Sequence, residues 1–396
     1  MPHSLNSGLR VRPQQNASAF SYVNSPKAVE TPAPRKSLLK ACAAGPWGAI
    51  EYHYLYLEAS QDLVDVFQMP SAVPRWSFPG LCREEVCAIF VKVGISSQSI
   101  ERWMKGELLE QNGVIHVLPT IAEVEALSPV QRGELYAVLA QWEGNSFHKD
   151  PVFITGGDVR DFLRNTDISA AHVEWFERMC YRRGHVLCFS DIPALLARAS
   201  DDSEVRRLFK LCTRTRTLIA RLRLTPTTDY ATLAAYWSKG GRRKDVLTML
   251  KSVAEAPGAD YLDLIHMLPP LPRKLLYSYP RLELAMHGRM PDCHWSSLNF
   301  FNYEPREYYI DTRLAASHVM ENFSQVDGPY RYGDVLFFLE GPTLQAFHSC
   351  VFIADDIVFT KNGDNAANPW VLSHLEDLRQ VYLSGNGGRV QGYRRK

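Results

Sequence analysis

The stretch Asp292-Cys293-His294-Trp295-Ser296-Ser297-Leu298 constrains the fold more than any other part of the chain. Pro291 interrupts the segment before it, the Asp292 carboxylate is a preferred helix cap, and Trp295 and Leu298 recur at helical spacing. This pattern predicts a helix that begins at Cys293. A thiol at a helix start meets the positive end of the helix dipole, which favours the thiolate over the thiol. The sequence therefore indicates a nucleophilic cysteine.

Two apolar runs further along the chain predict a pair of strands, over residues 333–339 and 346–354. His348 lies in the second run, beside Phe347 and Val351. A buried imidazole needs a hydrogen-bond partner, so His348 has either a structural partner or a chemical task. Either Cys293 or His348 alone would more often be an ordinary core side chain, because free cysteine is among the most buried residue types. The two together, in this order along the chain, indicate a cysteine hydrolase.

This order of elements resembles that of the NlpC-type cell-wall cysteine peptidases, which have Asp-Cys at a helix start, Gly-Asp at a strand start and a histidine on the next strand. The matching residues are Asp292-Cys293, Gly333-Asp334 and His348. The resemblance covers residues 286–396 and implies a papain-like module, in which the helix that bears the cysteine packs on a small antiparallel sheet. It implies that Cys293 is the nucleophile and His348 the general base, with no metal or other cofactor.

The chain departs from the family pattern at two places. His294-Trp295 stands where the family commonly has Ser-Gly, so these two bulky side chains are expected to narrow the cleft and to contact the substrate. The family often has a second histidine twelve positions after the base, which orients the imidazole. Thr360 holds that position here.

The third catalytic residue depends on the hairpin expected between residues 346–353 and 357–361. A three-residue loop centred on Asp355 sets Asn362 opposite His348. A two-residue loop shifts the register by one and brings Lys361 to the side of the histidine. We expect the first arrangement, because an asparagine amide can accept a hydrogen bond from the imidazole and fix its tautomer. Thr360 remains the alternative to Asn362.

The expected reaction is acyl transfer from a peptide or peptide-like amide to Cys293. His348 protonates the leaving amine and then activates the water that hydrolyses the thioester. The family resemblance makes peptidoglycan stem peptides the first candidate substrate. Two alternatives stay open. An acyltransferase would resolve the same thioester with an amine or an alcohol, and a non-catalytic binding module would keep both residues as packing groups in a degenerate peptidase fold.

The overall composition favours no charged partner. The chain has 396 residues, with 44 lysines and arginines against 43 acidic residues, so its net charge of +1 gives no drive toward nucleic acid or an anionic membrane. The eight cysteines are spread through apolar segments, which favours reduced thiols. Neither a secretory signal nor a membrane helix is evident. The cytoplasm is therefore the expected location, although export by an unrecognised route stays open.

The remaining chain is expected to hold a disordered leader over residues 1–40 and a mainly helical region with some strands over residues 41–285, through which a protein partner could bind. The whole protein is thus expected to be α+β. Proline-rich residues 269–273 mark the boundary region before the module, and a helix is expected in it from Pro369 to Tyr382. In the first region, helices are expected over residues 83–93, 97–110, 129–142, 170–181, 192–199, 204–211, 230–237 and 243–254, and strands over residues 52–57, 114–118 and 185–189.

Overall fold

The computed structural model describes residues 39–396, apart from 107, 240, 342–343 and 384–387. The leader expected over residues 1–40 lies outside the described residues except for its last two positions, and the second of these, Lys40, begins a strand. The described chain is a mixed α+β structure with antiparallel sheets, which confirms the prediction at that level. In the same residues, no helix is long and apolar enough to cross a membrane.

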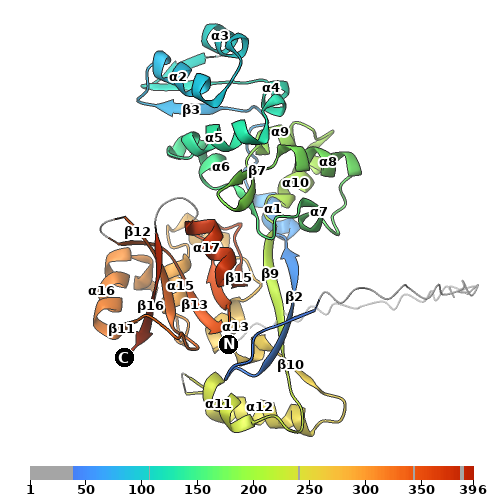
Figure 1. Ribbon diagram of the computed structural model, residues 1–396, viewed down its shortest axis with the longest axis vertical. Helices are drawn as coiled ribbons and strands as arrows, with labels where there is room; N and C mark the ends of the chain where they lie inside the picture. Colours follow the sequence, from blue (N-terminus) through green and yellow to red (C-terminus); the bar gives the residue numbers. More distant parts are fainter. Residues whose placement is uncertain (1–38, 107, 240, 342–343, 384–387) are drawn as a thin grey trace, which may run out of the picture. The chain divides into compact units, whose positions relative to one another are not determined.

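Three of the sheets in the described chain are formed by strands from the region before residue 270 (Figure 1). The first has the order β1 (Lys40–Ala41), β2 (Ala49–Leu57), β9 (Thr215–Arg223) and β10 (Tyr261–Asp263). The second has the order β3 (Trp76–Pro79), β5 (Val114–Val117) and β4 (Leu108–Gln111). The third has the order β6 (Val152–Ile154), β8 (Val186–Phe189) and β7 (Tyr181–Arg183).

The helices of this region follow the hydrophobic spacing closely. Helices α2 (Arg83–Val93) and α11 (Tyr230–Trp237) begin and end where the pattern predicts. Helix α3 (Ser97–Gly106) is shorter than predicted, because residues 108–111 pair with β5 as strand β4 instead of continuing the helix. The other helices are α1 (Gln61–Val66), α4 (Ile121–Ala126), α5 (Pro129–Leu139), α6 (Ser146–Lys149), α7 (Val159–Phe162), α8 (Ala170–Met179), α9 (Ile192–Leu196), α10 (Asp202–Leu211) and α12 (Arg243–Glu255).

Strand β9 is an element that the residue pattern does not predict. It lies in an arginine-rich part of the chain, residues 206–223, and pairs along its whole length with β2. Leu218, Ala220 and Leu222 alternate into the core. Three arginines of this part of the chain form ion pairs with acids: Arg214 with Glu58, Arg216 with Asp377 and Arg221 with Glu51.

The C-terminal residues form a six-stranded sheet, coloured orange to red in Figure 1. The strand order is β11 (Phe323–Val326), β16 (Arg389–Arg395), β12 (Val335–Glu340), β13 (Gln345–Ala354), β14 (Ile357–Lys361) and β15 (Trp370–His374), and every pair is antiparallel. The helices around it are α13 (Pro270–Leu275), α14 (Leu282–Met286), α15 (Cys293–Leu298), α16 (Thr312–Asn322) and α17 (Leu375–Leu383).

Each face of this sheet contributes to a separate apolar cluster. Val351 and Ile353 of β13 pack in the cluster that contains Trp295 and Leu298 of α15. Cys350 and Phe352 alternate with them and pack with Leu375 and Leu378 of α17. The prediction of one helix from Pro369 to Tyr382 is wrong in its first half. Residues 370–374 form β15, because pairing with β14 satisfies their backbone groups and still buries Trp370 and Leu372.

The Gly333-Asp334 pair at the start of β12 has a structural explanation. Gly333 has a φ of +85°, and the ring of Phe301 lies 2.2 Å from where its Cβ would be, so no other residue fits there without rearrangement. Asp334 is fully buried and accepts two hydrogen bonds from the Arg394 guanidinium, at 2.8 and 2.6 Å. It also lies 3.7 Å from Nζ of Lys239. Asp334 therefore links the start of β12 to the neighbouring strand β16 and to Lys239 in the preceding region of the chain.

The boundary expected near residue 285 stays a prediction, because the core continues across it. One buried cluster contains Leu218 and Trp237 from before this position together with Trp295 and Leu372 from after it. The Thr217 hydroxyl also donates to the backbone oxygen of Leu372 at 2.9 Å. The sheet that bears His348 is thus packed directly on β9 of the earlier region.

Candidate active site around Cys293

Cys293 is the first residue of α15, which confirms the predicted helix start. Asp292 caps the helix, because its carboxylate accepts a hydrogen bond of 2.7 Å from the backbone N–H of Trp295. Helix α15 packs on β13 and β14. The local sequence therefore brings the thiol to the strand that carries His348.

The Cys293 thiol is buried, with only 4% of the residue exposed. Burial and the negative charge of Asp292 raise the pKa of the thiol to about 12, although the backbone N–H groups of Ser349 and His294 and the charge of Lys361 act in the opposite direction. The expectation that the helix start produces a thiolate is therefore wrong for this resting state. Desolvation outweighs the helix dipole, and the carboxylate that caps the helix disfavours the anion.

His348 is buried in β13, with 1% of the residue exposed. Its ring stacks on Tyr382 of α17, with centroids 4.0 Å apart and an interplanar angle of 16°, and it meets Phe338 edge to face. Burial, together with the nearby charge of His294, holds the pKa of His348 well below its ordinary value. The ring is therefore neutral at pH 7, which is the form that can accept a proton.

Thr360, and not Asn362, contacts the imidazole. Thr360 Oγ1 lies 3.2 Å from His348 Nε2, and the same hydroxyl donates to the backbone oxygen of Ser349 at 3.3 Å. Thr360 therefore holds the ring through Nε2, as donor or as acceptor according to the tautomer of His348. In the described residues, Asn362 Oδ1 is buried without a hydrogen-bond partner. The expectation that Asn362 orients the ring is thus replaced by the alternative, Thr360.

The hairpin between β13 and β14 has the two-residue turn of one predicted arrangement and the strand register of the other. Asp355 and Asp356 form a two-residue turn, and Ala354 pairs with Ile357. Phe352 nevertheless pairs with Val358, because the residue between Phe352 and Ala354 is an extra, bulged residue. A bulge of one residue cancels the register shift that the shorter turn would cause. Thr360 therefore shares a face with His348, and Lys361 points to the other face.

Cys293 and His348 lie on opposite sides of β13, and no hydrogen bond joins them in the described part of the chain: α15 packs on the face of Ser349, whereas the His348 ring faces α17. The sulfur instead accepts from the backbone N–H of Ser349, the residue after His348. A negative charge on Cys293 would also raise the pKa of Tyr382, the ring on which His348 stacks. The resting arrangement thus holds the neutral imidazole and the Thr360 hydroxyl on the α17 side of the sheet, and the thiol with Lys361 on the α15 side. Direct proton transfer requires a movement of the side chains.

Lys361 is a component of the site to which we assign no role from the sequence alone. It is fully buried, and its Nζ donates to the backbone oxygens of Gly363 and Asn365 at 2.8 and 3.0 Å. Burial lowers its pKa to about 8, while the negative charges of Cys293 and Asp364 act to raise it. The sequence signal that could have identified Lys361 is its position as a single charged residue at the end of the apolar strand β14. Its charge would stabilise a thiolate at Cys293.

The two residues expected to contact substrate occupy different surroundings. His294 is half-buried, its ring stacks on Phe337, and its Nδ1 lies 3.0 Å from Ser349 Oγ. It also lines a cavity. Trp295 is instead 4% exposed and belongs to the core of the module. The expectation that Trp295 contacts the substrate is therefore wrong, because the helix directs this side chain into the core and not toward the cavity.

The cap of α15 provides a test of the thiol's electrostatics. We expect Asp292→Asn to lower the pKa of Cys293, because it removes the nearby negative charge while an asparagine caps a helix as well as an aspartate does. Alkylation by iodoacetamide at pH 8 should become about tenfold faster, and the rate should reach half its maximum at a lower pH. Mass spectrometry of the Cys293 peptide measures both.

The matched control is Asp311→Asn, because Asp311 caps α16 through the same kind of hydrogen bonds. This change should leave the alkylation profile of Cys293 unchanged. An unchanged profile in Asp292→Asn as well would mean that the capping charge does not act on the thiol.

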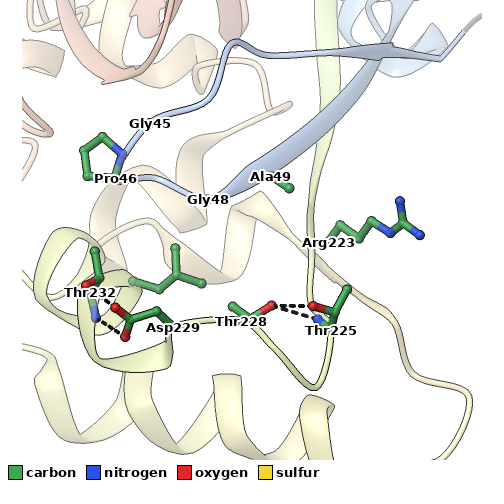
Figure 2. A pocket seen from close by; sticks show the side chains of 10 residues that line it. Gly45, Pro46, Gly48, Ala49, Arg223, Thr225, Thr228, Asp229 and Thr232 are labelled. Carbon is green, nitrogen blue, oxygen red and sulfur yellow. Dashed lines mark hydrogen bonds between the residues drawn. The ribbon is translucent and has the colours of Figure 1, made fainter.

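A second pocket lies away from Cys293, with a volume of about 320 Å³ (Figure 2). Its polar side chains are engaged locally. Asp229 accepts from the backbone N–H groups of Ala231 and Thr232 at the start of α11, and the hydroxyls of Thr225 and Thr228 lie 3.1 Å apart. These groups stabilise a turn and a helix start. The cluster around Cys293 and His348 therefore remains the better candidate for chemistry.

The side chains of the described residues also offer no metal centre: no group of three or more His, Cys, Asp or Glu side chains among them could hold a metal ion. No protein-family model, no curated protein and no solved structure matches this chain, so the site is interpreted from its own geometry.

Proposed function

We propose that this protein is a cysteine hydrolase that cleaves an amide bond of a peptide or peptide-like substrate through a thioester on Cys293. The observation that carries the proposal is the arrangement of three side chains. The thiol stands at a capped helix start against Ser349 on one face of β13, and the imidazole of the preceding residue, His348, points to the other face, where it contacts Thr360. A nucleophile, a base and a group that orients the base are what acyl transfer to a thiol requires.

The resting protonation states determine the first step. Cys293 is a thiol and His348 is neutral, so one ring nitrogen of His348 carries a lone pair that can accept a proton. Proton transfer requires His348 to leave its stack on Tyr382 and to reach the α15 side of β13. The sulfur then attacks the carbonyl carbon while the thiol proton passes to His348. Lys361 stabilises the negative charge on sulfur before the new bond is complete.

The remaining steps return every group to its starting state. The C–N bond of the tetrahedral intermediate breaks, and His348 gives its proton to the leaving amine. His348 then takes a proton from water as the water attacks the thioester carbonyl, and the C–S bond breaks with return of that proton to sulfur. The backbone N–H of Cys293, at the start of α15, is the simplest donor to the carbonyl oxygen when it becomes negative.

The proposed fold relationship is to the NlpC-type peptidases. The helix that bears Cys293, the antiparallel sheet on which it packs and the strand position of His348 support it. Peptidoglycan stem peptides remain the substrate that this resemblance suggests. Cytoplasmic location and a protein partner for the N-terminal region are parts of the same proposal.

A non-catalytic binding module is the second candidate, and one observation favours it. Cys293 is 4% exposed and its pKa is raised to about 12, as for a packed structural thiol. An acyltransferase would form the same thioester as the hydrolase. Detection of the thioester therefore separates both enzymes from the binding module, and the acceptor of the acyl group then separates the two enzymes.

The test is to incubate the full chain with p-nitrophenyl acetate and to measure its intact mass over time. We expect an acetyl group on Cys293 that hydrolyses in water and that is absent from Cys293→Ala. Faster loss of the acetyl group to added glycine methyl ester than to water would favour the acyltransferase. No acetyl group on Cys293 at any pH between 6 and 10 would overturn both enzyme proposals.

Thr360 and Asn362 can be separated by substitution. Thr360→Val keeps the side-chain shape but removes the hydroxyl that orients His348, so kcat should fall about tenfold or more. Thr360→Ser should restore most of the activity. Asn362→Ala should leave kcat within about twofold, because no hydrogen bond joins Oδ1 to His348 in the described residues. The opposite ranking would return the orienting role to Asn362.

A further inference from the structure

A cavity of about 430 Å³ adjoins the candidate site on the side of His294. It lies between α16, β12 and the first residues of β13. This size is within the range of small-molecule sites in proteins. The lining residues are His294, Leu298, Thr312, Ala315, Ala316, Val319, Met320, Phe337, Leu339, Leu344, Gln345, Ala346 and Tyr393.

The chemistry of the lining selects the kind of group that the cavity could hold. None of its described residues is an aspartate, glutamate, lysine or arginine, and most are aliphatic or aromatic. A charged group would lose its hydration there without an ionic partner. An apolar chain would gain by burial. The carboxylates of a stem peptide therefore do not fit this cavity, whereas a hydrocarbon chain does.

Large apolar side chains at the cavity are exposed to solvent. Met320 is 73% exposed and Leu344 is 44% exposed, and both line the cavity. Leu344 also has a φ of +53°, a conformation that a branched residue rarely adopts. Exposed apolar groups that border an apolar cavity are typical of a binding site whose ligand covers them.

The cavity reaches the residue next to Cys293 in the chain, although neither Cys293 nor His348 lines it. His294 follows Cys293 in the chain and lines the cavity, and its ring bonds to Ser349, the neighbour of His348. Ala346, which also lines the cavity, accepts a hydrogen bond from the same ring through its backbone oxygen. A carbonyl held near the Cys293 sulfur would thus have this cavity on one side of it.

We infer that the cavity binds an aliphatic chain on the acyl side of the substrate, so that the protein acts on acylated amines or related acyl compounds with an apolar acyl group. This inference rests on the proposed function, because it places the chain on the carbon that Cys293 attacks. His294 stands between the chain and the thiol.

The first test is the chain-length dependence of turnover by the full-length protein. With p-nitrophenyl acetate, butyrate, hexanoate, octanoate and decanoate, we expect kcat/KM to rise about threefold to fourfold for each methylene until the cavity is filled. Ala316→Trp should lower the chain length at which the rise ends, because Ala316 lines the cavity from the exposed side of α16. The control is Ser317→Trp, an equally exposed neighbour that does not line the cavity and should keep the original limit.

The second test measures binding without chemistry. Calorimetry of hexanamide, octanamide and decanamide with Cys293→Ala should show dissociation constants that decrease with chain length to the same limit. Equal affinities, or a limit that Ala316→Trp does not change, would overturn the inference. If p-nitrophenyl acetate is hydrolysed but kcat/KM does not rise with chain length, the inferred chain site is wrong and the proposed hydrolase is retained. Chain-length-dependent amide binding without an acyl group on Cys293 would overturn the hydrolase and leave only an apolar-chain site.

Discussion

Replacing Cys293 with alanine is expected to abolish hydrolysis, with a loss of at least about a thousandfold in kcat, because no other group takes the place of the nucleophile in a thioester mechanism. The fold should persist. Removing one buried sulfur costs about 1 kcal/mol, a small part of the stability of a domain. Steady-state turnover of p-nitrophenyl acetate measures the first effect, and the thermal midpoint of unfolding measures the second.

Cys350→Ala is the matched control for this variant. Cys350 is also a buried thiol and lies two residues from His348, but it packs in the cluster beneath α17 and not at the start of α15. Its loss should reduce stability by a similar amount and leave turnover largely intact. Equal loss of turnover in both variants would contradict the assignment of Cys293. A large loss of stability in Cys293→Ala would instead support a packing role for its thiol.

Asp334→Ala is expected to destabilise the protein by about 3–5 kcal/mol, which is the largest effect on stability that we predict. Asp334 is fully buried and accepts two hydrogen bonds from Arg394. Its removal leaves the Arg394 guanidinium, of which 26% is exposed, without its carboxylate in the middle of the sheet. Urea unfolding of the full chain, followed by tryptophan fluorescence, measures the change in midpoint.

Asp364→Ala serves as the control, because Asp364 is an exposed carboxylate in the loop after β14. A surface change of this kind should alter the free energy of unfolding by no more than about 0.5 kcal/mol. A loss for Asp334→Ala no larger than that for Asp364→Ala would show that the Asp334–Arg394 pair does not hold β12 to β16.

The candidate site shows how far residue patterns reach. The start of α15 was predictable because proline, a capping carboxylate and apolar spacing are local signals. The strands of His348 and Thr360 were predictable from their apolar runs. The residue that contacts His348 was not, because the expected pairing of Phe352 with Val358 does form, but β14 ends at Lys361, and the ring meets Thr360 inside the strand instead of Asn362 beyond its end.

The same limit applies to larger elements. Residues 370–374 have helical spacing, but they form β15 because an open edge of β14 was available for pairing. Residues 215–223 look like a charged surface, but they form β9 because β2 lies beside them and acids neutralise their arginines. In both cases the partner lies far away in the sequence, and tertiary pairing outweighed the local preference.

By itself, the sequence determined where α15 begins, which strands carry His348 and Thr360, and that the protein is α+β, since caps, turns and apolar periodicity act over a few residues. Only the tertiary structure decided that the Cys293 thiol is buried and protonated, that Thr360 orients His348, that Lys361 supplies a buried cation and that an apolar cavity adjoins His294. The physical reason is that burial, charge and register are set by groups that the chain brings together from distant positions, and no local pattern encodes their distances.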